Sequence, residues 1–118
     1  MKTKLVIIES PYAGDIEKNV EYARACMRDS IKRGEAPYAS HLLLTQVLDD
    51  TKEHEREKGI EIGLLWGARA DVTAVYDDLG ISPGMSKGIQ RAIAERRPVQ
   101  IRSIYKTKLE KSDELEQN

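Results

Sequence analysis

The chain has one cysteine and no phenylalanine among its 118 residues, and its only aromatic side chains besides histidine are five tyrosines and one tryptophan. A single thiol excludes an intrachain disulfide and a zinc cluster built from several cysteines. So few aromatic rings also disfavour a platform on which the bases of a single strand would stack. We expect Cys26 to be a small buried or half-buried apolar residue of a helix.

An excess of charge of one sign is also missing. The sequence contains 20 acidic and 19 basic residues, which gives a formal charge of −1. A domain that binds nucleic acid is usually clearly basic, so this balance argues against such a partner. The charge balance does not exclude binding of a small anionic ligand by backbone amides.

Long apolar runs are absent as well. Only four consecutive apolar residues occur near the N-terminus, at positions 5–8, and a turn follows them. This run is too short for the apolar region of a signal peptide or for a membrane span. We therefore expect a soluble, cytoplasmic protein without a membrane partner, and a chain of this length predicts one domain.

Strand and helix patterns alternate along the sequence. Runs rich in apolar and β-branched residues at 4–9, 36–39, 72–76 and 98–104 are typical of short strands. Helical patterns lie between them, with Asp15, Ser40 and Ser82 as expected N-caps and Gly34 as a helix stop. This order predicts a Rossmann-like, doubly wound α/β fold with a mainly parallel sheet of four or five strands. The domain would span residues 1–105, and residues 106–118 would form a charged tail.

The spacing of apolar residues predicts which helix faces are buried. In the first helix the predicted face comprises Ile16, Val20, Ala23, Met27 and Ile31. In the last helix the predicted stripe comprises Met85, Ile89, Ala92 and Ile93. Leu64, Leu65 and Trp66 are expected in the core or in an interface between subunits.

Three loops should meet at one edge of the sheet, because ligands of open parallel sheets bind outside the carboxyl ends of the strands. These loops are residues 9–15, 38–41 and 77–86. Two of them lead into helices, whose first N–H groups attract phosphate or carboxylate, and Gly14 and Gly84 would let a ligand approach the backbone. Neither the glycine fingerprint of dinucleotide-binding folds nor a Walker phosphate loop is present.

Several short motifs occur here in a characteristic order. They are SPYAGD at 10–15, P-x-x-S-H at 37–41, Arg56, AD at 70–71, ISPGM at 81–85, Ala92 and RPV at 97–99. This order resembles the nucleoside 2-deoxyribosyltransferase-like superfamily, most closely its small phage and prophage members, over residues 4–104. The resemblance implies a Rossmann-like fold, a nucleoside or nucleotide ligand between the loops, and a homo-oligomer.

One position departs from the family's pattern. In the transferases and the related nucleotide N-glycosidases, a glutamate four residues after the glycine of the last helix start attacks the anomeric carbon. Counting from Gly84 places that position at Gly88, which has no side chain. Glycosyl transfer of this kind needs a positioned carboxylate. Its relocated candidates are Glu9, at the end of the first strand, and Asp77 or Asp78, at the end of the third.

The residues expected to bind the ligand lie on the three loops. They are Ser10, Pro11, Tyr12, Ala13, Gly14, Tyr38, His41, Asp77, Ser82, Gly84, Met85 and Ser86. No nucleophile elbow is present, so His41 is expected to form a hydrogen bond with the backbone or with a ligand phosphate rather than to act in a triad. We expect neither a metal nor a cofactor.

Two functions follow from these expectations. The favoured one is non-catalytic binding of a nucleotide-derived small molecule. Given the phage-type resemblance, one version is a sponge that sequesters a nucleotide immune signal, such as an ADP-ribose derivative or a cyclic nucleotide, in the service of immune evasion. The alternative is a nucleotide N-glycosidase or deoxyribosyltransferase with Glu9 or Asp77 as a relocated nucleophile. A purely structural role would leave the small residues of the loops unexplained.

Overall fold

Four parallel strands form the centre of the computed structural model, which describes residues 2–105. Their spatial order is β2 (Ala36–Tyr38), β1 (Leu5–Glu9), β3 (Val72–Tyr76) and β4 (Val99–Arg102). Each neighbouring pair is parallel, with Ile7 opposite Tyr38 and Thr73, and Val75 opposite Ile101. The predicted parallel, Rossmann-like α/β sheet is confirmed, with four strands. The tail predicted at 106–118 lies outside the described residues.

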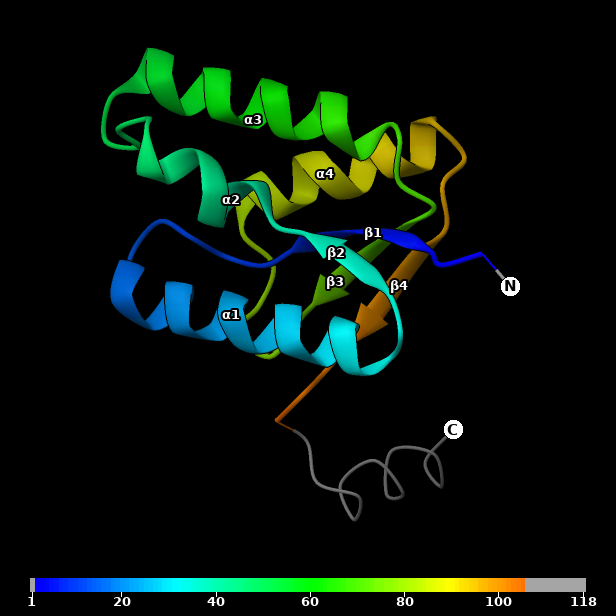
Figure 1. Ribbon diagram of the computed structural model, residues 1–118. Coiled ribbons are helices and arrows are strands. Elements are labelled where there is room, and N and C mark those ends of the chain that lie inside the picture. Colours follow the sequence, from blue (N-terminus) through cyan, green and yellow to red (C-terminus); the bar gives the residue numbers. More distant parts are fainter. Residues whose placement is uncertain (1, 106–118) are drawn as a thin grey trace.

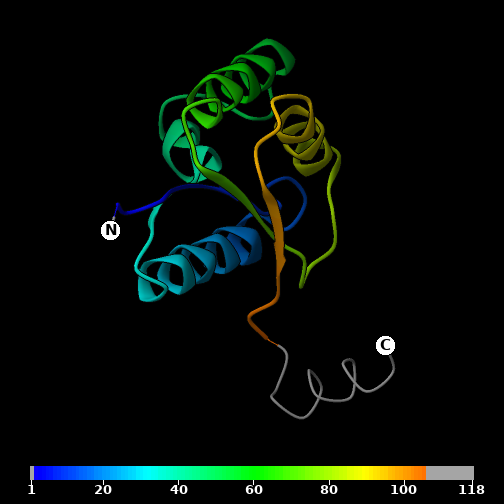
Figure 2. The same cartoon turned by 90° about the vertical axis from the view of Figure 1, so that its right-hand side faces the viewer.

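Helices cover both faces of the sheet (Figure 1). One face carries α1 (Ile16–Lys32) alone. The other carries α2 (Ser40–Leu43), the short 3₁₀ helix η1 (Leu44–Gln46), α3 (Glu53–Gly67) and α4 (Pro83–Ala94). Figure 2 shows the same two layers after a quarter turn. We call these two faces the α1 side and the cleft side. No helix within residues 2–105 is long and apolar enough to cross a membrane.

The predicted helix boundaries are confirmed at two starts and one stop. The Asp15 carboxylate accepts a hydrogen bond from the backbone N–H of Lys18 at 3.2 Å, which caps α1. Gly34 follows the end of α1 with φ +82°, a backbone conformation that favours glycine. Ser82 caps α4, because its Oγ accepts a hydrogen bond from the Met85 N–H at 3.2 Å.

The expectation that Ser40 caps the next helix is wrong. Ala39 occupies the N-cap position of α2 without any side-chain cap, and Ser40 is the first helical residue. The Ser40 side chain instead lies beneath α3, where a Cβ added at Gly63 would come within 2.7 Å of its Oγ. The hydroxyl therefore faces the crossing of two helices, which the sequence around residue 40 does not reveal.

Alternation along the strands decides which side chains face each layer. Val6 and Ile8 of β1 pack against Tyr22 and Cys26 of α1 in the main apolar cluster. Ile7 and Glu9, at the alternate positions of β1, face the cleft side. A short strand of five residues therefore places one acidic side chain among the helices of the cleft side.

The buried face of α1 differs from the predicted one. Its buried residues are Asn19, Tyr22, Ala23, Cys26 and Ser30. Of the predicted face, Ala23 is fully buried and Met27 is partly buried against the core. Ile16 and Ile31 are 41% and 58% exposed. Small side chains let α1 approach the sheet closely, and the polar ones form hydrogen bonds, so apolarity alone did not identify the face.

Two other burial expectations also fail in part. Met85 and Ala92 of α4 are buried as predicted, whereas Ile93 is 64% exposed. Trp66 and Leu65 are 61% and 59% exposed, which excludes the core for them, while the alternative, an interface between subunits, stays a prediction. The burial of Cys26 is confirmed.

Candidate functional site

A cleft of about 220 Å³ opens on the cleft side, at the carboxyl end of β1. Its walls come from the loop after β1, from α2 and η1, from α3, and from the start of α4. This is the point at which the chain leaves β1 for one face of the sheet and β3 for the other, where open α/β sheets bind ligands. Most of the wall is apolar, and its polar groups are few.

Seven of the twelve residues expected to bind a ligand line this cleft. They are Ser10, Tyr12, Ala13, His41, Ser82, Gly84 and Met85. Five do not line it, namely Pro11, Gly14, Tyr38, Asp77 and Ser86. The structure thus brings together parts of all three predicted loops. Whether these residues bind a ligand remains a prediction.

Glu9 lies at the inner end of the cleft, against Gly88 of α4. A Cβ added at Gly88 would come within 2.5 Å of Glu9 Cδ and would overlap its carboxyl oxygens. The carboxyl of Glu9 therefore occupies the space in which a side chain at position 88 would begin. Position 88, where the resemblance predicts a carboxylate, and Glu9, the expected substitute, therefore lie against each other.

The Glu9 carboxyl is mostly protonated at neutral pH. Burial raises its pKa to about 8, and the positive charge of Arg97 opposes this shift only in part. No described residue donates a hydrogen bond to either oxygen. Its oxygens are not among the fully buried side-chain atoms of the described residues that lack a partner, so they reach the open space of the cleft.

Ser10 and His41 form a second polar pair in the cleft. Ser10 Oγ and His41 Nε2 lie 2.7 Å apart and share a hydrogen bond. Burial lowers the pKa of His41 to about 4, so the imidazole is neutral at pH 7. The bond connects the loop after β1 to α2, and thereby fixes two walls of the cleft. No carboxylate orients the imidazole as in a hydrolytic triad, among the hydrogen bonds of the described residues.

The two helix starts expected to hold phosphate differ in position and in free donors. At α4, Pro83 has no N–H and the Met85 N–H is bonded to Ser82, which leaves the Gly84 N–H as the donor nearest the cleft. At α1, the Asp15 carboxylate caps the first turn, and Gly14 lies outside the cleft wall. Only the α4 start contributes to the site.

Asp77 and Asp78 face away from the cleft. Asp77 accepts a hydrogen bond from the hydroxyl of Ser103 at 2.5 Å. Asp78 accepts bonds from the Tyr22 hydroxyl at 2.6 Å and from two backbone N–H groups of the segment after β4. Both carboxylates are thus used within the fold, and of the relocated candidates only Glu9 lines the cleft.

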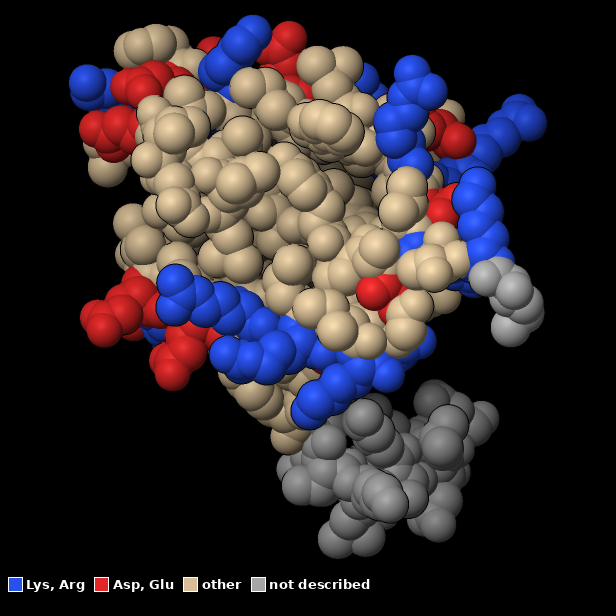
Figure 3. Space-filling view, in the orientation of Figure 1, with Lys and Arg blue, Asp and Glu red and all other residues tan. Residues whose placement is uncertain are grey.

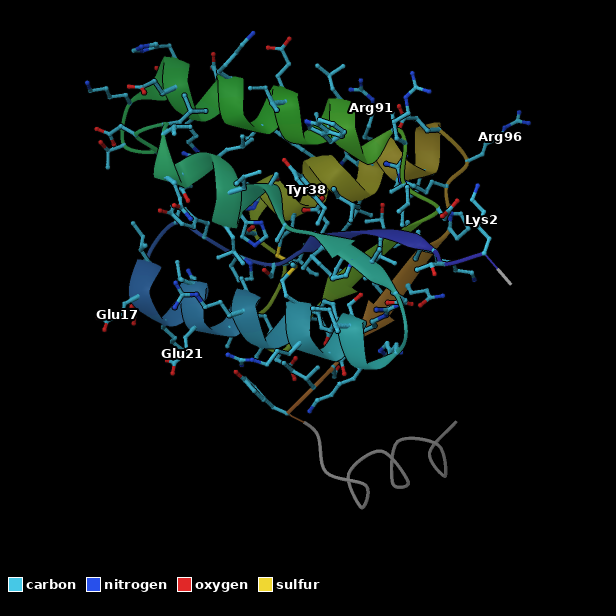
Figure 4. The ribbon with its side chains drawn as sticks, viewed as in Figure 1. Lys2, Glu17, Glu21, Tyr38, Arg91 and Arg96 are labelled. Atoms are coloured by element: carbon cyan, nitrogen blue, oxygen red, sulfur yellow. The ribbon has the colours of Figure 1, made fainter. Side chains whose placement is uncertain are left out.

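Tyr38 lies beside the cleft wall rather than in it. Its ring stands 6.1 Å from the ring of Trp66 on α3, on the cleft side of the sheet (Figure 4). Its hydroxyl is buried and has no hydrogen-bond partner among the described residues. This is a second unpartnered polar group on the same side as Glu9.

Sequence reasoning missed the wall contributed by α3. That wall comprises Glu55, Arg56, Gly59, Ile60, Gly63 and Leu64. Glycines at 59, 63 and 67 recur every fourth residue, so they share one face of α3 and let it approach its neighbours. This spacing was visible in the sequence and could have identified the face. Asp50, in the preceding loop, could not have been placed, because loop geometry is not encoded in a short-range pattern.

Comparison with known proteins agrees with this architecture. A family model described as "Domain of unknown function (DUF7768)" matches residues 4–102. The fold is similar to that of a 2-deoxyribosyltransferase from the psychrotolerant bacterium Bacillus psychrosaccharolyticus, with a TM-score of 0.61 and 16% identity over 92% of this chain and 80% of that chain. It is also similar to the CMP N-glycosidase BcmB of Clostridium botulinum, with a TM-score of 0.51 and 12% identity over 98% and 100% of the two chains. No curated protein matches the sequence.

Proposed function

This chain belongs to the family described as "Domain of unknown function (DUF7768)", and we propose that it binds a nucleotide-derived small molecule in the cleft without cleaving it. The proposal draws on the position of the cleft at the carboxyl end of β1, on its apolar wall with few polar groups, and on a fold similar to that of two nucleoside-processing enzymes.

One observation carries the non-catalytic part of the proposal. The α4 position that would supply the nucleophile is Gly88, and the carboxyl that fills its space belongs to Glu9. A glycosyl-transfer nucleophile acts in its ionised form. With a pKa of about 8, about a tenth of the Glu9 carboxyl is ionised at pH 7. At this position the cleft therefore offers a mostly neutral hydrogen-bonding group, whereas glycosyl transfer needs a carboxylate anion.

Binding without chemistry is useful where a ligand must be withheld from another protein. A sponge for a nucleotide immune signal, either an ADP-ribose derivative or a cyclic nucleotide, is the specific version that we propose. Such a protein releases its ligand intact and slowly. A half-life of release of minutes or longer would support sequestration, and a half-life of milliseconds would contradict it.

A second function is favoured by the same contact. Because Glu9 fills the space of the family carboxylate, it is placed to act as a relocated nucleophile in a nucleotide N-glycosidase or deoxyribosyltransferase. A bound ligand that supplies positive charge would favour its ionised form. This alternative predicts that free base accumulates with time and that Glu9→Gln abolishes the accumulation.

The experiment separates the two functions directly. Purified protein is incubated with a mixture of nucleosides, nucleoside monophosphates, cyclic nucleotides and ADP-ribose, then separated from unbound molecules and denatured. Mass spectrometry of the released fraction, and of molecules that co-purify with the protein, identifies the ligand. Intact ligand in stoichiometric amount supports the binder. Free base that increases with time in the unseparated mixture overturns it in favour of the enzyme, and the absence of both a retained molecule and free base overturns both.

A further inference from the structure

The inner end of the cleft contains a carboxyl group that the fold itself does not use. Glu9 has no hydrogen-bond donor among the described residues, although its backbone is fixed in β1 by pairing with β3. Its oxygens are not among the fully buried side-chain atoms of residues 2–105 that lack a partner, so they reach the open space of the cleft. A carboxyl that the fold leaves unpaired in the wall of a cleft is placed to contact a ligand.

The neighbouring groups do not complete its hydrogen bonds. On α2, His41 is neutral and bonds Ser10. Before β4, Arg97 donates hydrogen bonds to Thr73 and Glu95, and acts on Glu9 only through its charge. On the α4 wall, Gly88 offers no side chain.

The charges of the outer wall are balanced to within one unit. Asp50, Glu55 and Arg56 line the same cleft and are the other charged groups there, among residues 2–105. They provide one positive and two negative charges. No surplus of positive charge in the cleft holds Glu9 in its ionised form, so the carboxyl stays a neutral acid.

We propose that Glu9 is the ligand-contacting acid of the cleft and that, as a neutral carboxylic acid held in place by Gly88, it pairs with a ligand group that both donates and accepts a hydrogen bond. This inference rests on the proposed function and deepens it. A sugar hydroxyl and the amide-like edge of a base share that chemistry. A neutral acid has one O–H donor and one carbonyl acceptor side by side, which matches either group.

Gly88 is the positioning residue of this contact. Any side chain at position 88 overlaps the carboxyl of Glu9, whose end can move because it is flexible. Gly88→Ala should therefore preserve the fold and displace the acid. Gly67 is the matched control, since a Cβ there would meet its nearest neighbours at 3.7 Å and 3.9 Å, which is ordinary contact, and Gly67 does not line the cleft.

The test measures the affinity of adenosine, cytidine, AMP and CMP by calorimetry at pH 7 for the parent and four variants. Gly88→Ala and Glu9→Ala should weaken the best-binding probe by about tenfold or more, which equals about 1.4 kcal/mol. Glu9→Gln keeps a donor and an acceptor and should bind within about threefold of the parent, as should Gly67→Ala. Circular dichroism monitors folding, and Glu9→Ala decides the matter if Gly88→Ala does not fold.

The pH profile gives a readout that a merely structural role would not change. Parent affinity should fall as the pH rises through 8, whereas the affinity of Glu9→Gln should stay level. If the affinity of Glu9→Gln falls as far as that of Glu9→Ala, the ionised form is the partner and the neutral acid is wrong. If a probe binds the parent, Gly88→Ala and Glu9→Ala equally well, Glu9 does not contact the ligand, while the proposed function stands.

The absence of binding by every probe, in this test and in the mixture above, overturns the proposed function and this inference with it. Where binding occurs, 2′-deoxy and 3′-deoxy forms of the best nucleoside separate the two sources of the contact. If Glu9→Ala costs nothing further once a hydroxyl has been removed, Glu9 pairs with that hydroxyl. If the cost stays the same for both deoxy forms, it pairs with the base.

Discussion

The two sides of the sheet differ in how completely their polar groups are paired. On the α1 side they are paired: Arg102 donates to both carboxylate oxygens of Glu35 at 2.9 Å and 2.8 Å, and to the hydroxyl of Tyr76 at 3.1 Å. The Tyr76 hydroxyl donates to Asp29 at 2.8 Å. These bonds connect α1, β3, β4 and the loop before β2 in one network.

On the cleft side two polar groups have no hydrogen-bond partner within the described part of the chain. The hydroxyl of Tyr38 is fully buried, and the carboxyl of Glu9 lines the open cleft. Four glycines of α3 and α4 line the cleft on the same side, at positions 59, 63, 84 and 88. The paired polar groups of the α1 side stabilise the fold, whereas the Glu9 carboxyl of the cleft side is the unpaired group that we propose contacts the ligand.

The difference between the two sides predicts the largest loss of stability for a substitution at Arg102. Its side chain is 3% exposed, and Arg102→Ala leaves Glu35 and Tyr76 without their common donor. Breaking a buried ion pair by removing one partner costs about 3–5 kcal/mol, so the free energy of unfolding in urea should fall by about that amount.

The control is Arg33→Ala. Arg33 forms an ion pair with Asp29 at 2.8 Å, but its side chain is 45% exposed. An exposed pair of this kind contributes less than about 1 kcal/mol. Equal losses for Arg33→Ala and Arg102→Ala would show that the buried network is not what stabilises the α1 side.

Two groups of the cleft side, Glu9 and His41, should make stability depend on pH in opposite directions. The pKa of Glu9 is about 4.5 in the unfolded chain and about 8 in the fold, so the folded state binds more protons and stability falls as the pH rises between these values. The pKa of His41 is about 6.5 unfolded and about 4 folded, which gives the opposite slope between those two values. The two slopes offset each other up to about pH 6.5.

Between pH 6.5 and 8, Glu9 alone should lower the free energy of unfolding, by up to about 1.4 kcal/mol per pH unit. Glu9→Gln should flatten this region. On the α1 side, hydrogen bonds from Arg102 hold the pKa of Glu35 below its ordinary value, so its contribution is present at neutral pH and lost in acid. Urea unfolding at half-unit steps of pH measures both regions, and a parent profile that is level from 6.5 to 8 would contradict the neutral Glu9.

Two tyrosine-to-phenylalanine substitutions, one on each side of the sheet, should show a smaller difference in stability. The Tyr22 hydroxyl donates to the Asp78 carboxylate at 2.6 Å and accepts from the Asp78 N–H at 3.1 Å. Tyr22→Phe should cost about 2 kcal/mol, because a bond to a charged group is lost and a donor is left unpaired. Tyr38→Phe removes a hydroxyl without a partner and should leave stability unchanged or raise it by up to about 1 kcal/mol. Thermal unfolding of both variants is the measurement, and equal losses would remove the distinction between the two sides.

The smallest effect on stability is expected at Trp66. Figure 3 shows a broad face without charged side chains over β2, α2 and α3. Trp66, Leu43 and Val47 are 61%, 54% and 79% exposed, and exposed apolar patches of this kind mark interaction surfaces. We propose that a second copy of the chain covers part of it. Trp66→Ser should change stability of the monomer by less than about 0.5 kcal/mol but weaken self-association in sedimentation. A parent that sediments only as a 13.3 kDa species would contradict this.

The fold could be predicted from local sequence patterns because its strands and caps depend on near neighbours. The apolar run of β3 and the Ser82-Pro83 start of α4 are found where they were expected. The buried face of α1 could not be predicted in this way. Ser30 is buried because it donates a hydrogen bond to Glu35, and Asn19 because it donates to two carbonyls of the loop after β1. A hydropathy pattern treats such residues as surface.

The site was predictable at the level of loops but not of contacts. Parallel strands bring their carboxyl ends to one edge, so Ser10, His41 and Gly84 were expected together, and they do line one cleft. That Glu9 lies against Gly88 depends on how closely α4 approaches β1. The distance between Glu9 and Gly88 is set by packing across the whole domain, which no local sequence pattern encodes.

One nuclear magnetic resonance experiment tests the central claim that the cleft side binds a nucleotide-derived molecule intact. Amide spectra of labelled protein are recorded over hours with the panel member that binds most tightly, together with the proton signals of the ligand. The account predicts shifts at Glu9, His41 and Gly84, unchanged signals around Arg102 and Tyr76, and a sugar–base bond that stays intact. Shifts confined to the α1 side, no shifts with any panel member, or the growth of free-base signals would contradict it.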